Sequence, residues 1–258
     1  MTIQEIEQKL KQVAAEYPAN MVAHQMEDIP RTAFNISLAL PASKPLDQSV
    51  ICDIGGGIGL FSVGCAAIGF GQVLLVDDFG DQVNRKVGES IFDIHHRHGV
   101  KVVARDVVAE GVSDLNVRLD VVTCFDSMEH WHRSPKALLH SLVSMLNPNG
   151  RLVLGVPNCV NLRKRLTVPF GRGKWTSMKD WYEPEIFRSH VREPDVEDLL
   201  YIADDLKLKN VQIYGRNWLG YQSKNKLMRQ FTGLADTLLR LRPSLCSNIY
   251  LVGERQVL

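Results

Sequence analysis

The stretch CDIGGGIG at residues 52–59 places four glycines directly after an apolar run that begins at Val50. Glycine allows positive φ and a close approach of the backbone, so a strand, a glycine-rich turn and a helix typically form a cradle for a cofactor. The dinucleotide fingerprint GxGxxG fails in every register, because its later glycines fall on Leu60, Ser62 or Ile58. The stretch therefore predicts the start of an α/β fold whose cofactor is not a dinucleotide.

Short apolar runs of strand type continue downstream and alternate with helical segments. Each run is apolar along its length, which is typical of parallel strands that are covered on both faces. After Pro157 the alternation stops, and a helix and two final strands follow. We expect a doubly wound α/β fold with a seven-stranded, mostly parallel sheet. The expected strands are 49–54, 72–77, 100–106, 119–125, 151–157, 210–215 and 247–255, and the expected helices are 61–70, 81–98, 134–150 and 195–206.

The N-terminal part of the chain differs from this pattern. Residues 2–17 repeat apolar side chains at helical spacing, and Thr2 and Glu5 are spaced as in a capping box. Residues 18–48 contain four prolines, which predicts a loop-rich segment with one short helix near 32–40. The expected organisation is an N-terminal helical cap at 1–48, a cofactor-binding core at 49–160, an insertion with a helix at 161–209, and a last part at 210–258 that contains a helical insertion at 222–245.

Composition restricts the class of protein. The chain has 258 residues, a net charge of +1 and 45% hydrophobic residues, so it has no basic excess that would favour nucleic acid. No apolar run approaches the roughly 20 residues of a membrane span, and the polar N-terminus lacks the apolar stretch of a signal peptide. Five cysteines occur without CxxC spacing. We therefore expect a cytoplasmic protein without a nucleic-acid partner, and the oligomeric state stays open.

The spacing Asp53-x-Gly55-x-Gly57-x-Gly59 resembles the first motif of the class I S-adenosylmethionine-dependent methyltransferases. This resemblance implies a Rossmann-like fold, a methyltransferase activity and S-adenosylmethionine as the cofactor. It implies that the glycines approach the methionine part of the cofactor and that the leading acid supports the loop. The cofactor-binding residues expected on this basis are Asp53, Gly55, Gly57, Gly59, Asp77 as the ribose-binding acid with Asp78 as its substitute, Asp106 and Val107 near the adenine, and Phe125 with Asp126 after the fourth strand.

Residues 126–132, DSMEHWH, follow the fourth strand and should open beside the methyl group. They resemble the glutamate–histidine segment of O-methyltransferases of the ubiquinone pathway. We expect His130 to act as a general base for a hydroxyl acceptor, with His132 as the second candidate and Glu129 ordering the segment. Some relatives hold a divalent metal with an acid three residues before the pair, as Asp126 is here, but two carboxylates and one imidazole are a partial ligand set. We expect no metal.

The segments after the fifth strand suggest the acceptor. Residues 161–174 carry five basic residues and no acid, and aromatic residues follow. Aromatic rings beside arginines suit a planar, sugar or phosphate-bearing acceptor, and Arg163, Trp181, Tyr182 and Trp218 are the expected contacts. The predicted helix at 222–245 places Leu238 and Leu241 on an apolar face and Asp236 on the outer face. The apolar face either packs on the domain or touches a membrane surface.

Together these patterns predict methyl transfer to a hydroxyl of a small-molecule, glycan or lipid-linked acceptor. The alternative is a non-catalytic subunit with the methyltransferase fold, which would be marked by a damaged glycine loop or a missing ribose-binding acid. Neither mark is present in the sequence.

Overall fold

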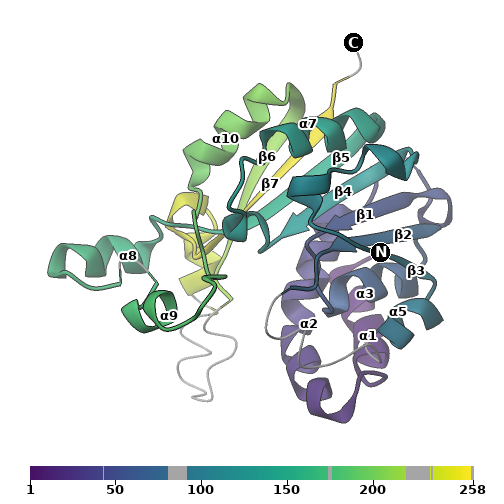
Figure 1. Cartoon of the computed structure of the whole chain (residues 1–258). Helices are drawn as coiled ribbons and strands as arrows, with labels where there is room; N and C mark the ends of the chain where they lie inside the picture. The colour runs from purple at the N-terminus through teal and green to yellow at the C-terminus, as the bar shows by residue number, and fades with distance from the viewer. Residues whose placement is uncertain (43, 81–91, 174–175, 219–232, 234, 257–258) are drawn as a thin grey trace.

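A seven-stranded sheet forms the centre of the protein, with the strand order β3-β2-β1-β4-β5-β7-β6 (Figure 1). The computed structural model describes residues 1–42, 44–80, 92–173, 176–218, 233 and 235–256. All strand pairs from β3 to β5 are parallel, whereas β7 runs antiparallel to both β5 and β6. The strands are β1 Val50–Ile54, β2 Gln72–Asp77, β3 Val100–Ala104, β4 Leu119–Phe125, β5 Leu146–Pro157, β6 Leu208–Arg216 and β7 Asn248–Arg255.

The sequence-based prediction of the sheet is confirmed, strand by strand and in its mostly parallel character. The one large difference is that β5 begins at Leu146 rather than near Arg151. Residues 146–150 contain a proline and a glycine, so they do not look like a strand, yet Leu146 pairs with Leu119 across an irregularity in the ladder. The order of strands reverses at β1, which is flanked by β2 and β4. In open α/β sheets ligands bind at the carboxyl ends of the strands at such a point.

Helices cover both faces of the sheet, as Figure 1 shows. The helices α1, α2, α3 and α5 pack on one face, while α7 and α10 pack on the other. The helix α10 begins at Val196, next to the predicted start at 195, and the side chain of Asp195 caps it. The helices are α1 Ile3–Ala14, α2 Ala19–Ala39, α3 Leu60–Ile68, α5 Phe92–Arg97, α6 Val107–Glu110, α7 Lys136–Met145, α8 Leu162–Thr167, α9 Met178–Tyr182 and α10 Val196–Asp205.

The N-terminal segment is more regular than predicted. The capping box of Thr2 and Glu5 is present at the start of α1. The expected loop-rich stretch is wrong, because α2 continues from Ala19 to Ala39 and includes Pro30. A proline inside a helix removes one backbone hydrogen bond. However, α2 buries an apolar face against α1 and α3, and this packing outweighs the local penalty. Both helices therefore contribute to the core beside the sheet.

The chain leaves the sheet after β5 and forms α8 and α9, which project beside the main body in Figure 1. Asn161 caps α8 through its side chain. Large apolar side chains on this projection are exposed, notably Phe170, Trp181 and Tyr182. Such a segment contributes little to the core, so its apolar residues are available for other contacts.

Half of the helical insertion predicted at 222–245 lies outside the described residues. Asp236 belongs to the described half and was expected on the outer face of the helix. Its side chain is instead buried, with only 2% exposed, and it accepts a hydrogen bond from Nε of Arg216 at 3.1 Å. Leu238 and Leu241, expected on the apolar face, are exposed. Packing of that face on the domain is therefore not seen for these two leucines. Within the described part of the chain, no helix is both long enough and apolar enough to cross a membrane.

Candidate active site

The glycine loop between β1 and α3 needs glycine at two positions. The φ angle is +69° at Gly55 and +57° at Gly57, in the left-handed region that favours glycine. A Cβ atom on Gly55 would overlap the hydroxyl of Ser127, which follows β4. The N–H of Gly55 donates to the carbonyl of Val76 in β2 at 2.8 Å. The loop thus lies against the ends of both strands that flank β1.

Asp53 supports this loop from inside the protein. Its carboxylate is 1% exposed and accepts hydrogen bonds from the hydroxyls of Ser62 at 2.8 Å and Thr123 at 2.9 Å. Burial raises the pKa of Asp53 to about 6, although both hydrogen bonds oppose the shift and the charge of Asp77 adds to it. Asp53 therefore joins β1, α3 and β4 beneath the glycines.

The raised pKa of Asp53 predicts a pH-dependent difference in stability between the protein and Asp53→Asn. Between the ordinary pKa of 3.8 and the folded value of about 6, the unfolded carboxyl is ionised while the folded one holds its proton. The free energy of unfolding of the wild type should therefore fall relative to that of Asp53→Asn as pH rises from 4 to 6, by up to about 3 kcal/mol. Urea unfolding of both proteins between pH 4 and 7.5 measures this difference, and a difference that stays constant over the range would contradict it.

Asp77 ends β2 and is held beside the glycine loop. The N–H of Gly57 donates to its Oδ2 at 2.9 Å, and the N–H of Phe79 donates to its Oδ1 at 2.6 Å. The structure therefore brings Asp77 and the glycines together at adjacent strand ends, as the sequence pattern requires.

The two remaining strand-end acids have local backbone partners. Asp78 accepts a hydrogen bond from the N–H of Gly80 at 2.8 Å and lies 3.6 Å from the guanidinium of Arg188. Asp106 caps α6 by accepting two backbone N–H groups of its first turn, at 3.1 and 3.0 Å, and Val107 is buried behind it. An acid that caps a helix can keep a second oxygen for another donor.

The end of β4 and the segment that follows it form the side of the site opposite to the end of β2. The ring of Phe125 packs against Phe61 at 5.0 Å and against Tyr250 at 6.2 Å between centroids. Asp126 has a φ of +47°, and its carboxylate forms an ion pair with Arg31 of α2. The positive φ turns the chain sharply after the strand, so that residues 128–130 fold back as a short helical turn.

Glu129 lies in this turn and is almost completely buried. It is 1% exposed, and its Oε2 has no hydrogen-bond partner among the described residues. Burial raises the pKa of Glu129 to about 7. Its backbone carbonyl accepts hydrogen bonds from the N–H groups of Val191, at 2.7 Å, and Arg192, at 3.2 Å. The turn is therefore fastened to a segment about sixty residues further along the chain.

The two histidines of the turn bond to the same distant segment. Nδ1 of His130 bonds to the carbonyl oxygen of Arg188 at 2.9 Å. Nε2 of His132 bonds to the carbonyl oxygen of Phe187 at 3.3 Å. His130 thus has the shorter bond, and this bond sets the orientation of its ring.

Comparison with known proteins identifies the family. A model of the methyltransferase domain matches residues 22–213, which is most of the chain. The chain belongs to the S-adenosylmethionine-dependent methyltransferases. A search among functionally curated proteins finds no match.

Solved structures resemble this methyltransferase over nearly the whole chain. A possible histamine N-methyltransferase from Thermotoga maritima is 12% identical with a TM-score of 0.56, and the match covers 96% of this chain and 99% of that one. Magnesium protoporphyrin IX methyltransferase from Synechocystis, solved with S-adenosylhomocysteine, is 16% identical with a TM-score of 0.54 and coverages of 96% and 94%. A methyltransferase from Archaeoglobus fulgidus is 18% identical, with a TM-score of 0.52 and coverages of 87% and 91%. At these identities the likeness shows the fold.

The residues of the methyltransferase fit S-adenosylmethionine. Gly55 and Gly57 both have a positive φ, and a side chain on Gly55 would collide with Ser127, so the loop keeps a bare backbone of the kind that lies close to a cofactor. Asp77 accepts one backbone hydrogen bond on each carboxylate oxygen, and a carboxylate of this kind suits the paired hydroxyls of a ribose.

The expected acceptor contacts of the methyltransferase fall into two groups. Arg163 lies on α8, and Trp181 and Tyr182 lie on α9, all exposed. Trp218 is only 6% exposed and donates its indole N–H to the hydroxyl of Tyr250 at 2.6 Å. Trp218 therefore stands behind the aromatic wall of the site, and the other three lie on the projecting segment.

Three site residues of the methyltransferase were not found from the sequence. His190 lies with its ring 4.9 Å from that of His130, at 86° between the planes. Arg188 reaches Asp78, and Arg31 pairs with the acid that follows β4. They come from α2 and from the segment before α10, far from the motifs in sequence, so no local spacing indicates them.

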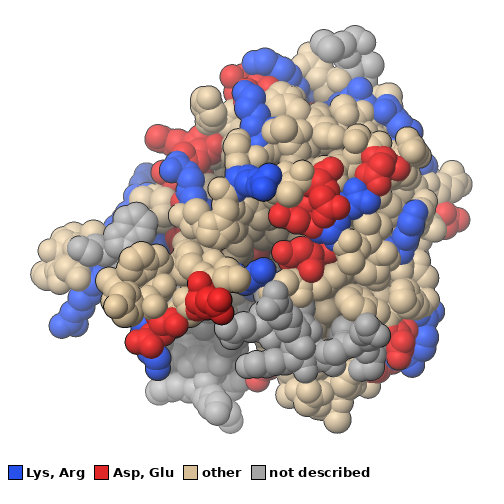
Figure 2. Space-filling view, in the orientation of Figure 1, with Lys and Arg blue, Asp and Glu red and all other residues tan. Residues whose placement is uncertain are grey.

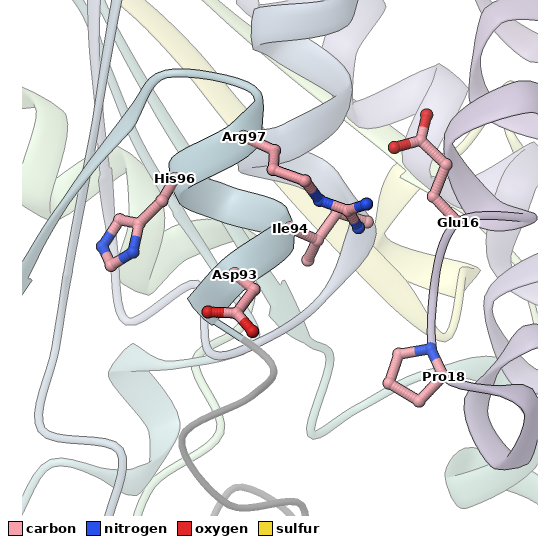
Figure 3. Close-up of a pocket in the computed structure, with 6 residues that line it drawn as sticks. All are labelled: Glu16, Pro18, Asp93, Ile94, His96 and Arg97. Carbon is pink, nitrogen blue, oxygen red and sulfur yellow. The ribbon is translucent and has the colours of Figure 1, made fainter.

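A surface pocket of about 570 Å³ lies elsewhere on the methyltransferase. Figure 3 shows Asp93, Ile94, His96 and Arg97 on α5, with Glu16 and Pro18 across from them. None of the six belongs to the glycine loop or to the strand-end acids. The pocket therefore does not coincide with the strand-end residues described above.

Proposed function

We propose that this methyltransferase transfers a methyl group to a hydroxyl oxygen of a small-molecule, glycan or lipid-linked acceptor. The observation that carries the proposal is the position of the Glu129–His130 pair. The pair lies in the same turn as Ser127, whose hydroxyl packs against Gly55 of the glycine loop. An imidazole next to the methyl donor supports removal of a proton from a hydroxyl acceptor.

S-adenosylmethionine, when bound, supplies a methyl group on a sulfonium sulfur that becomes a neutral thioether once the acceptor oxygen has taken the methyl. The chain holds the acceptor in line and receives its proton. Because Nδ1 of His130 bonds to the carbonyl of Arg188, Nε2 carries the lone pair of the neutral ring and can accept that proton. Glu129 keeps the turn in place through its backbone, and His132 is the second candidate base.

The surroundings support an acceptor of modest size and mixed polarity. Arg163, Trp181 and Tyr182 are exposed on the segment that follows β5 and can pack on a ring or bind a phosphate. Lys, Arg, Asp and Glu are interspersed over the face in Figure 2, which supports an acceptor other than a polyanion such as nucleic acid.

Membrane contact and cellular location also belong to the proposal. The exposed leucines Leu238 and Leu241 support a peripheral membrane contact near residues 222–245. All five cysteines are free thiols, which supports a reducing, cytoplasmic location. A non-catalytic role is not favoured, because the glycine loop and Asp77 are intact.

The test is to incubate the full chain with methyl-labelled S-adenosylmethionine and separate fractions of small molecules, glycans and glycolipids. We expect label in one fraction, in a product that resists base hydrolysis as an ether does. Label released by base as from an ester, or label on nitrogen, would contradict a hydroxyl acceptor. Asp77→Asn serves as the matched control, since it should lose donor binding.

A further inference from the structure

Three side chains with metal-ligating atoms meet beside the glycine loop. Glu129 and His130 lie in the turn after β4, while His190 comes from the segment between α9 and α10. One ligating atom of each lies within 4.8 Å of those of the other two. Bound zinc holds its ligands at about 2.0–2.2 Å, so small side-chain movements would bring the three onto one ion.

The two imidazoles are oriented as metal ligands usually are. Nδ1 of His190 bonds to the carboxylate of Glu193 at 2.7 Å, and Nδ1 of His130 bonds to the carbonyl of Arg188 at 2.9 Å. Metal-binding histidines commonly donate one N–H to such an oxygen, which fixes the tautomer with the lone pair on the other nitrogen. Glu193 is itself held in place behind His190 by an ion pair with Lys164.

The buried carboxylate of Glu129 suggests that a cation binds beside it. Its Oε2 has no hydrogen-bond partner among the described residues, which is costly for a buried oxygen. Two cationic side chains of the surrounding residues already have acidic partners, because Arg31 pairs with Asp126 and Lys164 pairs with Glu193. A divalent cation beside Glu129 would supply the missing interaction.

We infer that Glu129, His130 and His190 bind a divalent transition-metal ion of the zinc type, with Glu193 orienting His190. Two imidazoles and one carboxylate suit zinc and similar ions, whereas magnesium and calcium prefer sites made of oxygen ligands. Three protein ligands leave a coordination position open, as in catalytic zinc sites.

The role of the ion rests on the proposed function, although its binding does not. The acceptor hydroxyl would occupy the open position, where the ion lowers its pKa and the proton passes to water. His130 is then a ligand of the ion and acts on the proton through it. Since Ser127 of the same turn packs against Gly55, this hydroxyl would stand beside the donor.

The binding test uses the full chain after dialysis against a chelator. Titration with zinc chloride, followed by calorimetry, should give one ion per chain. Glu129→Gln and His190→Ala should each weaken binding by at least about 100-fold, and Glu193→Gln by about 10- to 100-fold. His140→Ala is the matched control, because His140 also bonds to a carboxylate, that of Asp205, but lies outside the cluster. Its affinity for zinc should equal that of the wild type.

Two further measurements keep the outcome clear. Circular dichroism checks that each variant is folded, and the visible spectrum of bound Co²⁺ reports nitrogen and oxygen ligands directly. Absence of stoichiometric zinc binding, a preference for magnesium, or unchanged affinity in His190→Ala would overturn the inference. Donor affinity is measured on the same samples. Zinc binding without methyl transfer would contradict the proposed function but not the metal site. Methyl transfer without zinc binding would contradict the metal site but not the proposed function.

Discussion

Replacing His130 by alanine should lower the rate of methyl transfer by at least about 100-fold, the usual contribution of a group that promotes proton removal. The acceptor hydroxyl then loses the side chain that assists its deprotonation at the donor loop. The affinity for S-adenosylmethionine should stay close to that of the wild type, because the loop and Asp77 do not depend on the imidazole. Single-turnover rates and calorimetric titration with the donor measure the two quantities.

The His130 variant also separates two ways in which the residue could act. If His130 accepts the proton directly, added imidazole should restore part of the rate, as a diffusing base. If it acts as a metal ligand, the variant should lose zinc binding together with activity. Full turnover in His130→Ala would mean that positioning alone suffices and would remove the residue from the chemistry. His132→Ala tests the second candidate, and we expect a smaller loss there.

Replacing Asp77 by asparagine should weaken S-adenosylmethionine binding by about 100-fold. A carboxylate that accepts two ribose hydroxyls makes charge-assisted hydrogen bonds, and each is worth about 1.5–3 kcal/mol. The amide keeps one acceptor oxygen but presents N–H groups to the other partner, including the N–H of Gly57. Calorimetric titration with the donor measures the loss.

Asp78→Asn is the control for this assignment. Asp78 has the same charge one position later, but its carboxylate bonds to the N–H of Gly80 and faces Arg188. Its replacement should change donor affinity less than tenfold. A larger loss in Asp78→Asn than in Asp77→Asn would reassign the ribose to Asp78. Thermal melting of both variants shows whether the glycine loop itself has been disturbed.

The sheet could be predicted from the sequence because each strand is a short apolar run that ends at a distinct turn signal. The helix α2 was missed because Pro30 is a strong local signal, whereas the packing that keeps the helix intact involves α1 and α3. Asp236 was assigned to the outer face of its helix because the local spacing of residues does not reveal a distant partner. Its partner, Arg216, lies twenty residues earlier, on β6. Local patterns indicate periodicity, but they do not indicate which face meets a distant partner.

The residues proposed to bind the donor have a clearer sequence pattern than those proposed to bind the acceptor. Gly55, Gly57 and Asp77 lie at strand ends, and the order of strands brings such ends together at one edge. His190 carries no local signal, because it lies in a loop and is brought to His130 by hydrogen bonds between that loop and the turn after β4. Side chains that arrive from loops in this way can be found only once the loop has been placed on the sheet.

One short piece of chain touches both halves of the site. Arg188 faces Asp78 at the end of β2, and His190 faces His130 after β4. Only two peptide bonds separate Arg188 from His190, a reach of about 7 Å when extended. If Arg188 moves when the adenosine end of the donor binds, the position of His190 should therefore change as well. Because this segment contacts both the donor side and the acceptor side, the two substrates should not bind independently. Steady-state kinetics should therefore show an ordered mechanism and not a random one.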